Sequence, residues 1–136
     1  MSWMGRLFGR RVEPTPEVQA TLAALAAWLE TPTTGYEKKV AQVMDDLAKA
    51  WRVPVREESA RGVMTFFEDR LLKLQTTTTG LTLEVDRETD WWETPTGHIF
   101  SVQIRFDRQL VGDQLISGRM YQVGRTGANR YLVVGK

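Results

Sequence analysis

The acidic run that begins at Glu84 has residue types and a spacing that could hold a catalytic metal ion. Carboxylates recur there at every second position, which places them on one face of an extended strand: Glu84, Asp86, Glu88 and Asp90. Such a face can hold Mg²⁺ for phosphoryl transfer. The solvated face of an amphipathic strand has the same pattern, and no Lys or His follows at a spacing that completes a nuclease motif. We therefore expect a solvated strand face and no metal.

His98 is the only imidazole of the chain and the second candidate for catalysis. A general base must lie within hydrogen-bond reach of a nucleophile and of a group that orients it. The nearest serine, Ser101, is three positions further on and therefore on the opposite face of a strand. The absence of Cys also excludes thiol nucleophiles and thiolate metal sites. We expect no catalytic residues and no cofactor, and a small metal- or His-dependent hydrolase is the least favoured alternative.

Basic and aromatic residues alternate in the C-terminal part of the chain, where a G-x-x-G loop also occurs between Gly124 and Gly127. A sheet surface of this composition can stack bases and neutralise phosphates, and loop amides can add phosphate contacts. The overall charge of +1 is low for a nucleic-acid-binding domain. A nucleic-acid-binding accessory protein is therefore the alternative function, with these candidate contacts: Arg105, Arg119, Arg125, Arg130 and Lys136.

The adjacent pair Trp91 and Trp92 is the most informative local feature for partner binding. The pair lies in an acidic loop, residues 87–97, between two predicted strands. Neighbouring side chains of an extended segment point to opposite sides, so both cannot enter one core. Trp is enriched at binding hot spots because it buries a large area at low entropic cost. The pair is expected to form a lid over the sheet edge or to anchor a partner or ligand, and partner binding is our functional hypothesis for it.

Residues 1–12 form a second candidate surface, a basic amphipathic segment. Apolar residues recur there at helical spacing, led by Trp3, Leu7 and Phe8, and three arginines lie mostly on the other side. Two glycines weaken such a helix by about 1 kcal/mol each. Such a segment can dock on a partner, and docking is our functional hypothesis for it. The alternatives are a tail that frays or packs on its own domain and, as a weaker expectation, contact with an anionic membrane.

Two helices are predicted next, over residues 15–31 and 34–53. Thr15 can cap the first, and Thr34 with Glu37 has the capping-box spacing at the start of the second. After Pro54 the apolar pattern changes to alternation and to residues that favour strands. We predict strands from about residue 55 to residue 135, including these segments: Val63–Glu68, Leu72–Thr79, Leu81–Asp86, Phe100–Phe106, Leu115–Val123 and Tyr131–Val134.

The links between the predicted strands are too short for crossover helices, so the sheet should be antiparallel. The predicted fold is α+β, with the N-terminal antiparallel helical pair packed on one face of a five- to seven-stranded antiparallel sheet. We expect two parts in the 136 residues: the amphipathic segment 1–13 and a single domain over 14–136.

Composition favours binding over catalysis. No long apolar segment is present that would act as a signal peptide or membrane span, so we expect a soluble, cytoplasmic protein. Charge is unevenly distributed, with basic ends around an acidic middle. We predict a non-catalytic protein-binding module: an adaptor, a chaperone-like accessory factor or a subunit of an assembly. Its partner is expected to be a protein, with a homodimer as one possibility.

Overall fold

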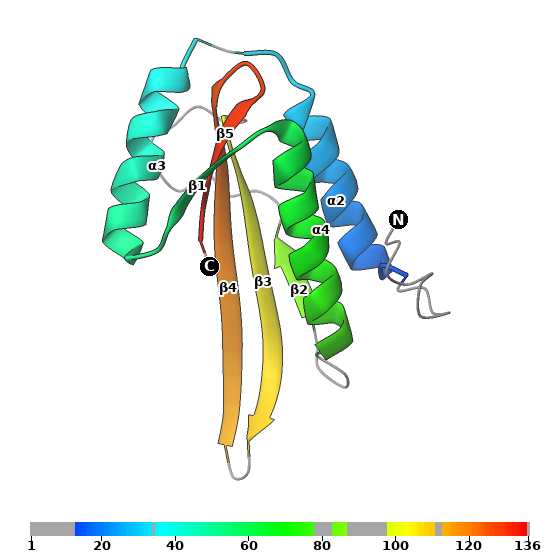
Figure 1. Cartoon of the computed structure of the whole chain (residues 1–136). Helices are drawn as coiled ribbons and strands as arrows, with labels where there is room; N and C mark the ends of the chain where they lie inside the picture. The colour runs from blue at the N-terminus through cyan, green and yellow to red at the C-terminus, as the bar shows by residue number, and fades with distance from the viewer. Residues whose placement is uncertain (1–12, 34, 78–82, 87–97, 111–112, 136) are drawn as a thin grey trace.

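The computed structural model describes residues 13–33, 35–77, 83–86, 98–110 and 113–135, which form three helices and one five-stranded sheet (Figure 1). All paired strands are antiparallel, so the predicted α+β class is confirmed. The elements follow one another along the chain in this order: α2 (Pro16–Leu29), α3 (Glu37–Trp51), β1 (Val55–Glu58), α4 (Ala60–Thr77), β2 (Leu83–Asp86), β3 (Ile99–Leu110), β4 (Asp113–Gly127) and β5 (Arg130–Val134). In space the strands are ordered β1-β5-β4-β3-β2.

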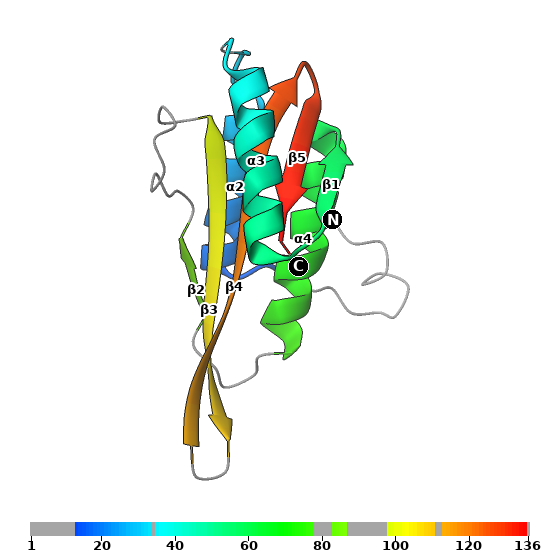
Figure 2. The same cartoon turned by 90° about the vertical axis from the view of Figure 1, so that its left-hand side faces the viewer.

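Helices cover both faces of this sheet, and Figure 2 shows α3 in front of it with α2 and α4 behind. The first face carries Phe100, Val102 and Tyr121, which are buried in one core with α2 and α4. The second face carries Ile99 and Val134, which are buried under α3. The prediction that the two N-terminal helices pack as a pair on one face is therefore not what the structure shows. The neighbour of α2 is α4, and the molecule has three layers.

α3 covers a face of its own because it has a long apolar stripe that must be buried. Its buried residues recur at helical spacing and lie over β4 and β5: Val40, Met44, Leu47 and Ala48. The link from residue 30 to residue 36 carries the chain from one face of the sheet to the other. The sequence pattern of each helix specifies which of its sides is apolar, but not which face of the sheet it covers.

α4 occupies a segment for which the sequence analysis predicts strands, and that prediction is wrong for residues 60–77. The buried apolar residues of this segment recur every three or four positions, as on one side of a helix: Val63, Phe66, Phe67 and Leu71. Val, Phe and Thr favour strands only weakly, and burial against the sheet outweighs that preference. The helical spacing was the stronger signal, and the residue types obscured it.

The start of α4 is capped by the residue that precedes it and by a residue from a distant turn. The hydroxyl oxygen of Ser59 accepts a hydrogen bond from the Gly62 amide at 3.1 Å, which is the usual role of an N-cap serine. The side-chain oxygen of Asn129, in the turn between β4 and β5, accepts one from the Ala60 amide at 2.9 Å. Asn129 has a positive φ of 54°, a conformation that Asn adopts more readily than most residues. The first amides of α4 are therefore satisfied within the protein.

The end of α2 is tied to the sheet through one backbone carbonyl. The Leu29 oxygen accepts a hydrogen bond from Arg125 Nη2 at 2.8 Å and another from the Tyr131 hydroxyl at 2.9 Å. The Arg125 guanidinium also lies 5.0 Å from the centre of the Tyr131 ring. Two donors on neighbouring strands thus share one acceptor at a helix end, where carbonyls lack helical partners.

This shared acceptor predicts that the two donors are coupled. Tyr131→Phe should lower the free energy of unfolding by about 0.5–1.5 kcal/mol, because Arg125 still satisfies the Leu29 carbonyl. Arg125→Met should then cost more in the Tyr131→Phe background than in the wild type, since it leaves that carbonyl without a donor. Urea unfolding of the four proteins of this double-mutant cycle measures both effects. Strict additivity would contradict the coupling.

Candidate functional site

A cavity of about 590 Å³ lies between β1 and α4 on the first face of the sheet, and we call it the cationic groove. Arg56 and Glu58 reach it from β1, because they pair with Val133 and Tyr131, whose side chains are in the first-face core. From α4 come residues at helical spacing along one side of the helix, including Phe66, Arg70 and Lys73. The single residue Ser59 joins the strand to the helix, so the two walls are held close together.

Positive charge exceeds negative charge in the cationic groove. Its charged lining residues are the cations Arg56, Arg61, Arg70 and Lys73 and the carboxylates Glu58 and Asp69. Glu58 is already engaged: its Oε2 lies 3.1 Å from Arg56 Nη2 and accepts a hydrogen bond from Arg56 Nε at 3.2 Å. No described carboxylate lies within ion-pair distance of Arg61 or Arg70. The groove therefore presents an excess of cationic donors to its interior.

Two guanidinium groups converge on the ring of Phe66. The Arg70 carbon Cζ is 4.5 Å from the ring centre and the Arg56 Cζ is 5.1 Å from it. The negative face of an aromatic ring attracts a cation by about 0.5–1 kcal/mol at an exposed site. Phe66 is held in turn by edge-to-face contacts with Phe67 at 5.1 Å and with Tyr121 at 5.8 Å. The Phe66 ring thus contacts two cations, one from β1 and one from α4.

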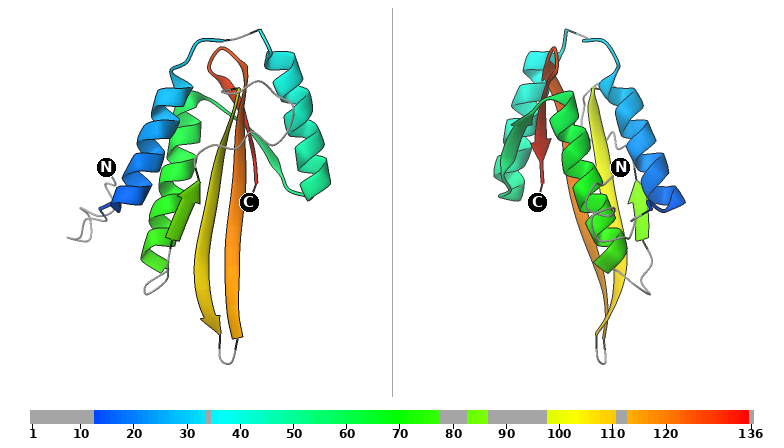
Figure 3. Two further views of the ribbon diagram at one scale, coloured as in Figure 1. Left: turned by 180° about the vertical axis from the view of Figure 1, so that it is seen from behind. Right: turned by 45° about the vertical axis from the view of Figure 1, so that its right-hand side comes forward.

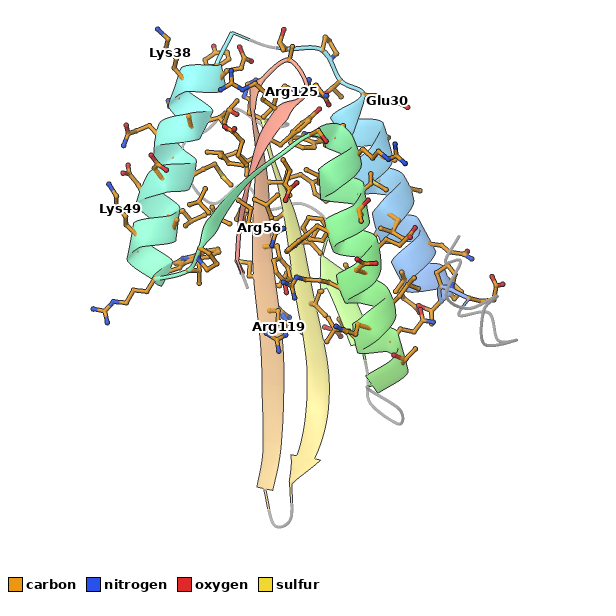
Figure 4. The ribbon with its side chains drawn as sticks, viewed as in Figure 1. Glu30, Lys38, Lys49, Arg56, Arg119 and Arg125 are labelled. Atoms are coloured by element: carbon orange, nitrogen blue, oxygen red, sulfur yellow. The ribbon has the colours of Figure 1, made fainter. Side chains whose placement is uncertain are left out.

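Arg119 lies on the same face of the sheet, since it pairs with Ile104, a residue of the first-face core. Figure 4 shows Arg56 and Arg119 on the same side of β4, with Arg119 further toward the hairpin end. Burial raises the pKa of the Tyr121 phenol, and the positive charges of Arg70 and Arg119 offset part of that rise. Arg119 extends the positive surface of the groove.

Two buried polar atoms beside the groove have no hydrogen-bond partner among the described residues, the Tyr121 hydroxyl and Arg70 Nε. Unpaired polar atoms in the interior cost about 1–3 kcal/mol each, more when charged. Structures usually satisfy such groups with protein, water or a ligand. Arg70 is the more informative of the two, because its whole guanidinium group makes no hydrogen bond or ion pair within the described part of the chain.

His98 lies away from this groove, against the ring of Tyr36 at a centroid distance of 4.8 Å. Its Nδ1 is buried and has no hydrogen-bond partner within the described ranges. Ser101 is fully buried on the second face and its hydroxyl donates to Gln122 Oε1. In the described part of the chain, no group of three or more His, Cys, Asp or Glu residues is arranged to hold a metal ion.

The predicted partner-binding residues lie outside the described residues, as does one predicted nucleic-acid contact: Trp3, Leu7, Phe8, Trp91, Trp92 and Lys136. Of the acidic run, Glu84 is described, and its Oε2 lies 3.9 Å from Arg105 Nη1 on the neighbouring strand. Glu88 and Asp90 also lie outside the described residues, as does Thr34 of the predicted capping box. Glu37 instead accepts hydrogen bonds from the Gly35 amide.

The four described arginines of the nucleic-acid alternative are not gathered on one surface. Arg125 is 9% exposed and holds the end of α2. Arg105 pairs with Gly118 and lies on the second face, whereas Arg119 belongs to the first. Arg130 is exposed and lies 3.8 Å from Glu57 on β1.

The cations of the cationic groove were not among the residues that the sequence analysis selected. Arg61, Arg70 and Lys73 come together only if residues 60–77 form a helix, and that segment was predicted as strands. The spacing of Phe66, Arg70 and Lys73 (i, i+4, i+7) was the available signal, since it places all three on one side of a helix.

The far end of the β3–β4 hairpin forms a second candidate site, the β-arm, residues 107–110 and 113–116. Its backbone pairs run from Asp107↔Ile116 to Leu110↔Asp113. Within the described residues, β2 pairs with β3 only as far as Phe106, and β5 pairs with β4 only from Gln122 onward. Figure 3 shows in both views that the hairpin extends beyond the helices. Among the described residues, the β-arm is thus a two-stranded ribbon that no other strand pairs with on either edge.

The chain matches no protein-family model, no curated protein and no solved structure. Within the described residues, no helix is long and apolar enough to cross a bilayer. The cationic groove and the β-arm are the two features of the described residues that suggest a function.

Proposed function

We propose that this protein is a non-catalytic protein-binding module, an adaptor or a subunit of an assembly, which binds its partner through the β-arm. The observation that carries the proposal is the length of the ladder between β3 and β4. It continues for four residue pairs beyond Phe106, where no other described strand lies alongside. The partner is a protein that supplies an extended strand, and a second copy of this chain is one form of it.

Strand energetics supports this interpretation. A two-stranded ribbon in water is at best marginally stable, because each strand has half of its backbone groups unpaired. An open edge offers a row of amides and carbonyls that an added strand can pair with, and proteins use this geometry for recognition. A ribbon that projects from a three-layered body can meet such a strand without rearrangement of the core.

The other two functions have less support. A nucleic-acid surface needs cations on one face, and the described arginines of that set lie on both faces or in the core. A hydrolase would need a partner for His98, whose ring stacks on Tyr36. The β-arm offers backbone amides and carbonyls to a partner strand.

Shortening the β-arm tests the proposal. In the variant, Asn-Gly replaces residues 107–116 and joins Phe106 to Ser117, which are paired across the ladder. An Asn-Gly turn suits a two-residue hairpin. The shortened variant should fail to capture the protein partner that the full-length chain captures from the source lysate. Any dimer of the wild type should be absent in the variant. Light scattering and quantitative mass spectrometry of the captured proteins measure the two losses.

The matched control is Val111→Asn, which places Asn before Gly112 and keeps the arm at full length. This control should retain the partner and the dimer. Both variants should unfold at the wild-type temperature, since the arm lies outside the two cores. The proposal fails if the shortened variant keeps the same partner and oligomeric state, or if the wild type is a monomer that captures no protein reproducibly.

A further inference from the structure

The geometry points to a second binding activity: the cationic groove takes a small phosphorylated ligand. Nothing in this inference depends on the β-arm. It is carried by three features of the groove: the excess of cations, the convergence of two guanidinium groups, and a cavity of suitable size.

The charge balance of the cationic groove indicates that its ligand is an anion. Four cations and two carboxylates line the groove, and one carboxylate, Glu58, is paired with Arg56. Arg119 is a further cation on the same face. Like charges held together raise the energy of the protein, and an anion that binds among them relieves that repulsion.

The position of the guanidinium groups indicates where the anion binds. Arg56 and Arg70 lie close to the same ring, Phe66, so their Cζ atoms are within about 10 Å of each other. An oxyanion bound beside this ring can accept charge-assisted hydrogen bonds of about 2.8 Å from Arg70, and the positive charge of Arg56 adds to the attraction. Arg70 has its donors available, because it makes no hydrogen bond or ion pair to the described residues.

The start of α4 is not the anion site. Its Ala60 and Gly62 amides donate to Asn129 and Ser59, and the Glu58 carboxylate lies directly against Gly62. The ligand therefore lies further along the helix, between Phe66 and Lys73. The cations of the middle of the groove are the ones that recognise it.

Phosphate suits this site better than carboxylate does. A phosphate monoester carries about −1.5 to −2 charges at neutral pH and has three acceptor oxygens, whereas a carboxylate carries one charge and has two. Guanidinium forks bind phosphate oxygens in pairs. A cavity of about 590 Å³ lies within the range of small-molecule sites, about 300–1,000 Å³, so an organic part fits beside the phosphate.

Isothermal titration of the full chain with inorganic pyrophosphate tests the inference, at low salt so that phosphate contacts are not screened. Arg70→Gln should weaken binding about tenfold or more, which corresponds to about 1.4 kcal/mol. Arg61→Gln and Arg119→Gln change exposed residues and should each weaken it by a smaller factor. Arg70→Lys, which keeps the charge and loses the fork, should be intermediate.

The control is Lys49→Gln, an exposed cation on α3 at the opposite side of the molecule, which should bind pyrophosphate like the wild type (Figure 4). The arm-shortened variant should also bind normally, so failure of this inference is distinct from failure of the proposed function. Absence of pyrophosphate binding overturns the inference. So does equal weakening by Lys49→Gln and Arg70→Gln, or succinate binding as tight as that of pyrophosphate. Circular dichroism of each variant establishes that it is folded.

Discussion

Gly124→Ala is expected to lower the free energy of unfolding by about 1–3 kcal/mol, the usual cost of overpacking a core. An alanine Cβ at this position would lie 2.5 Å from Val40 Cγ1 and 2.9 Å from Met44 Cγ. Both contacts come from α3, which lies directly on the backbone of β4. Met44 can change rotamer, but the β-branched Val40 is stiff and buried, so the helix itself must move. Urea unfolding at equilibrium measures the loss.

The control for Gly124→Ala is Gly127→Ala on the same strand. There the added Cβ would meet only the flexible Arg130 side chain, at 3.4 Å, which is ordinary contact. Alanine replaces glycine in a strand without penalty where space allows, so this variant should be neutral or slightly stabilising. Val40→Ala should partly rescue Gly124→Ala, because it removes the closest atom. Equal stability of the two glycine variants would show that α3 does not lie against Gly124.

Phe67→Ala is expected to have the largest effect of any single substitution considered, a loss of about 3–5 kcal/mol. Phe67 is fully buried and makes edge-to-face contacts with Phe66 at 5.1 Å and with Tyr121 at 5.5 Å. Its removal opens a cavity where α4 meets the centre of the sheet. A domain at the lower end of the ordinary stability range, about 5 kcal/mol, would be left marginally folded, which thermal unfolding detects directly.

Thr65→Ala tests whether residues 60–77 form the helix that the structure shows or the strands that the sequence predicts. In a strand, positions 65 and 67 lie on the same face, whereas in a helix they lie on nearly opposite sides. Thr65 is exposed and Phe67 is buried, so Thr65→Ala should change stability by no more than about 0.5 kcal/mol. A large effect of Thr65→Ala together with a small effect of Phe67→Ala would contradict the placement of α4.

Elements with local signals were predicted well from the sequence. Thr15 accepts a hydrogen bond from the Val18 amide and begins α2, as its residue type and the following proline indicate. The alternation from Phe100 to Phe106 predicted the inner part of β3. These signals depend only on neighbouring residues. α4 was missed because Ser59, its N-cap, has no acidic residue three positions later and because its residue types favour strands.

The candidate site depends on information that local patterns do not carry. The cationic groove joins residues of β1 and α4 across a sheet edge, and Arg119 comes from β4, so its recognition requires the strand order. The close packing of α3 against Gly124 is likewise a tertiary contact that no local pattern indicates. Arg125 appeared to be a surface cation in the sequence, and its hydrogen bond to Leu29 places it in the interior.

The pairing of β1 with β5 has a consequence for synthesis of the protein on the ribosome. β1 precedes α4 in the chain, yet it pairs with β5, the last strand. The end of α2 likewise depends on hydrogen bonds from two residues near the C-terminus, Arg125 and Tyr131. Neither element can reach its native contacts while the C-terminal strands are still being translated. Such long-range closure slows folding and leaves apolar helix faces exposed in the nascent chain. Completion of the fold is therefore expected to follow the emergence of β5 from the exit tunnel.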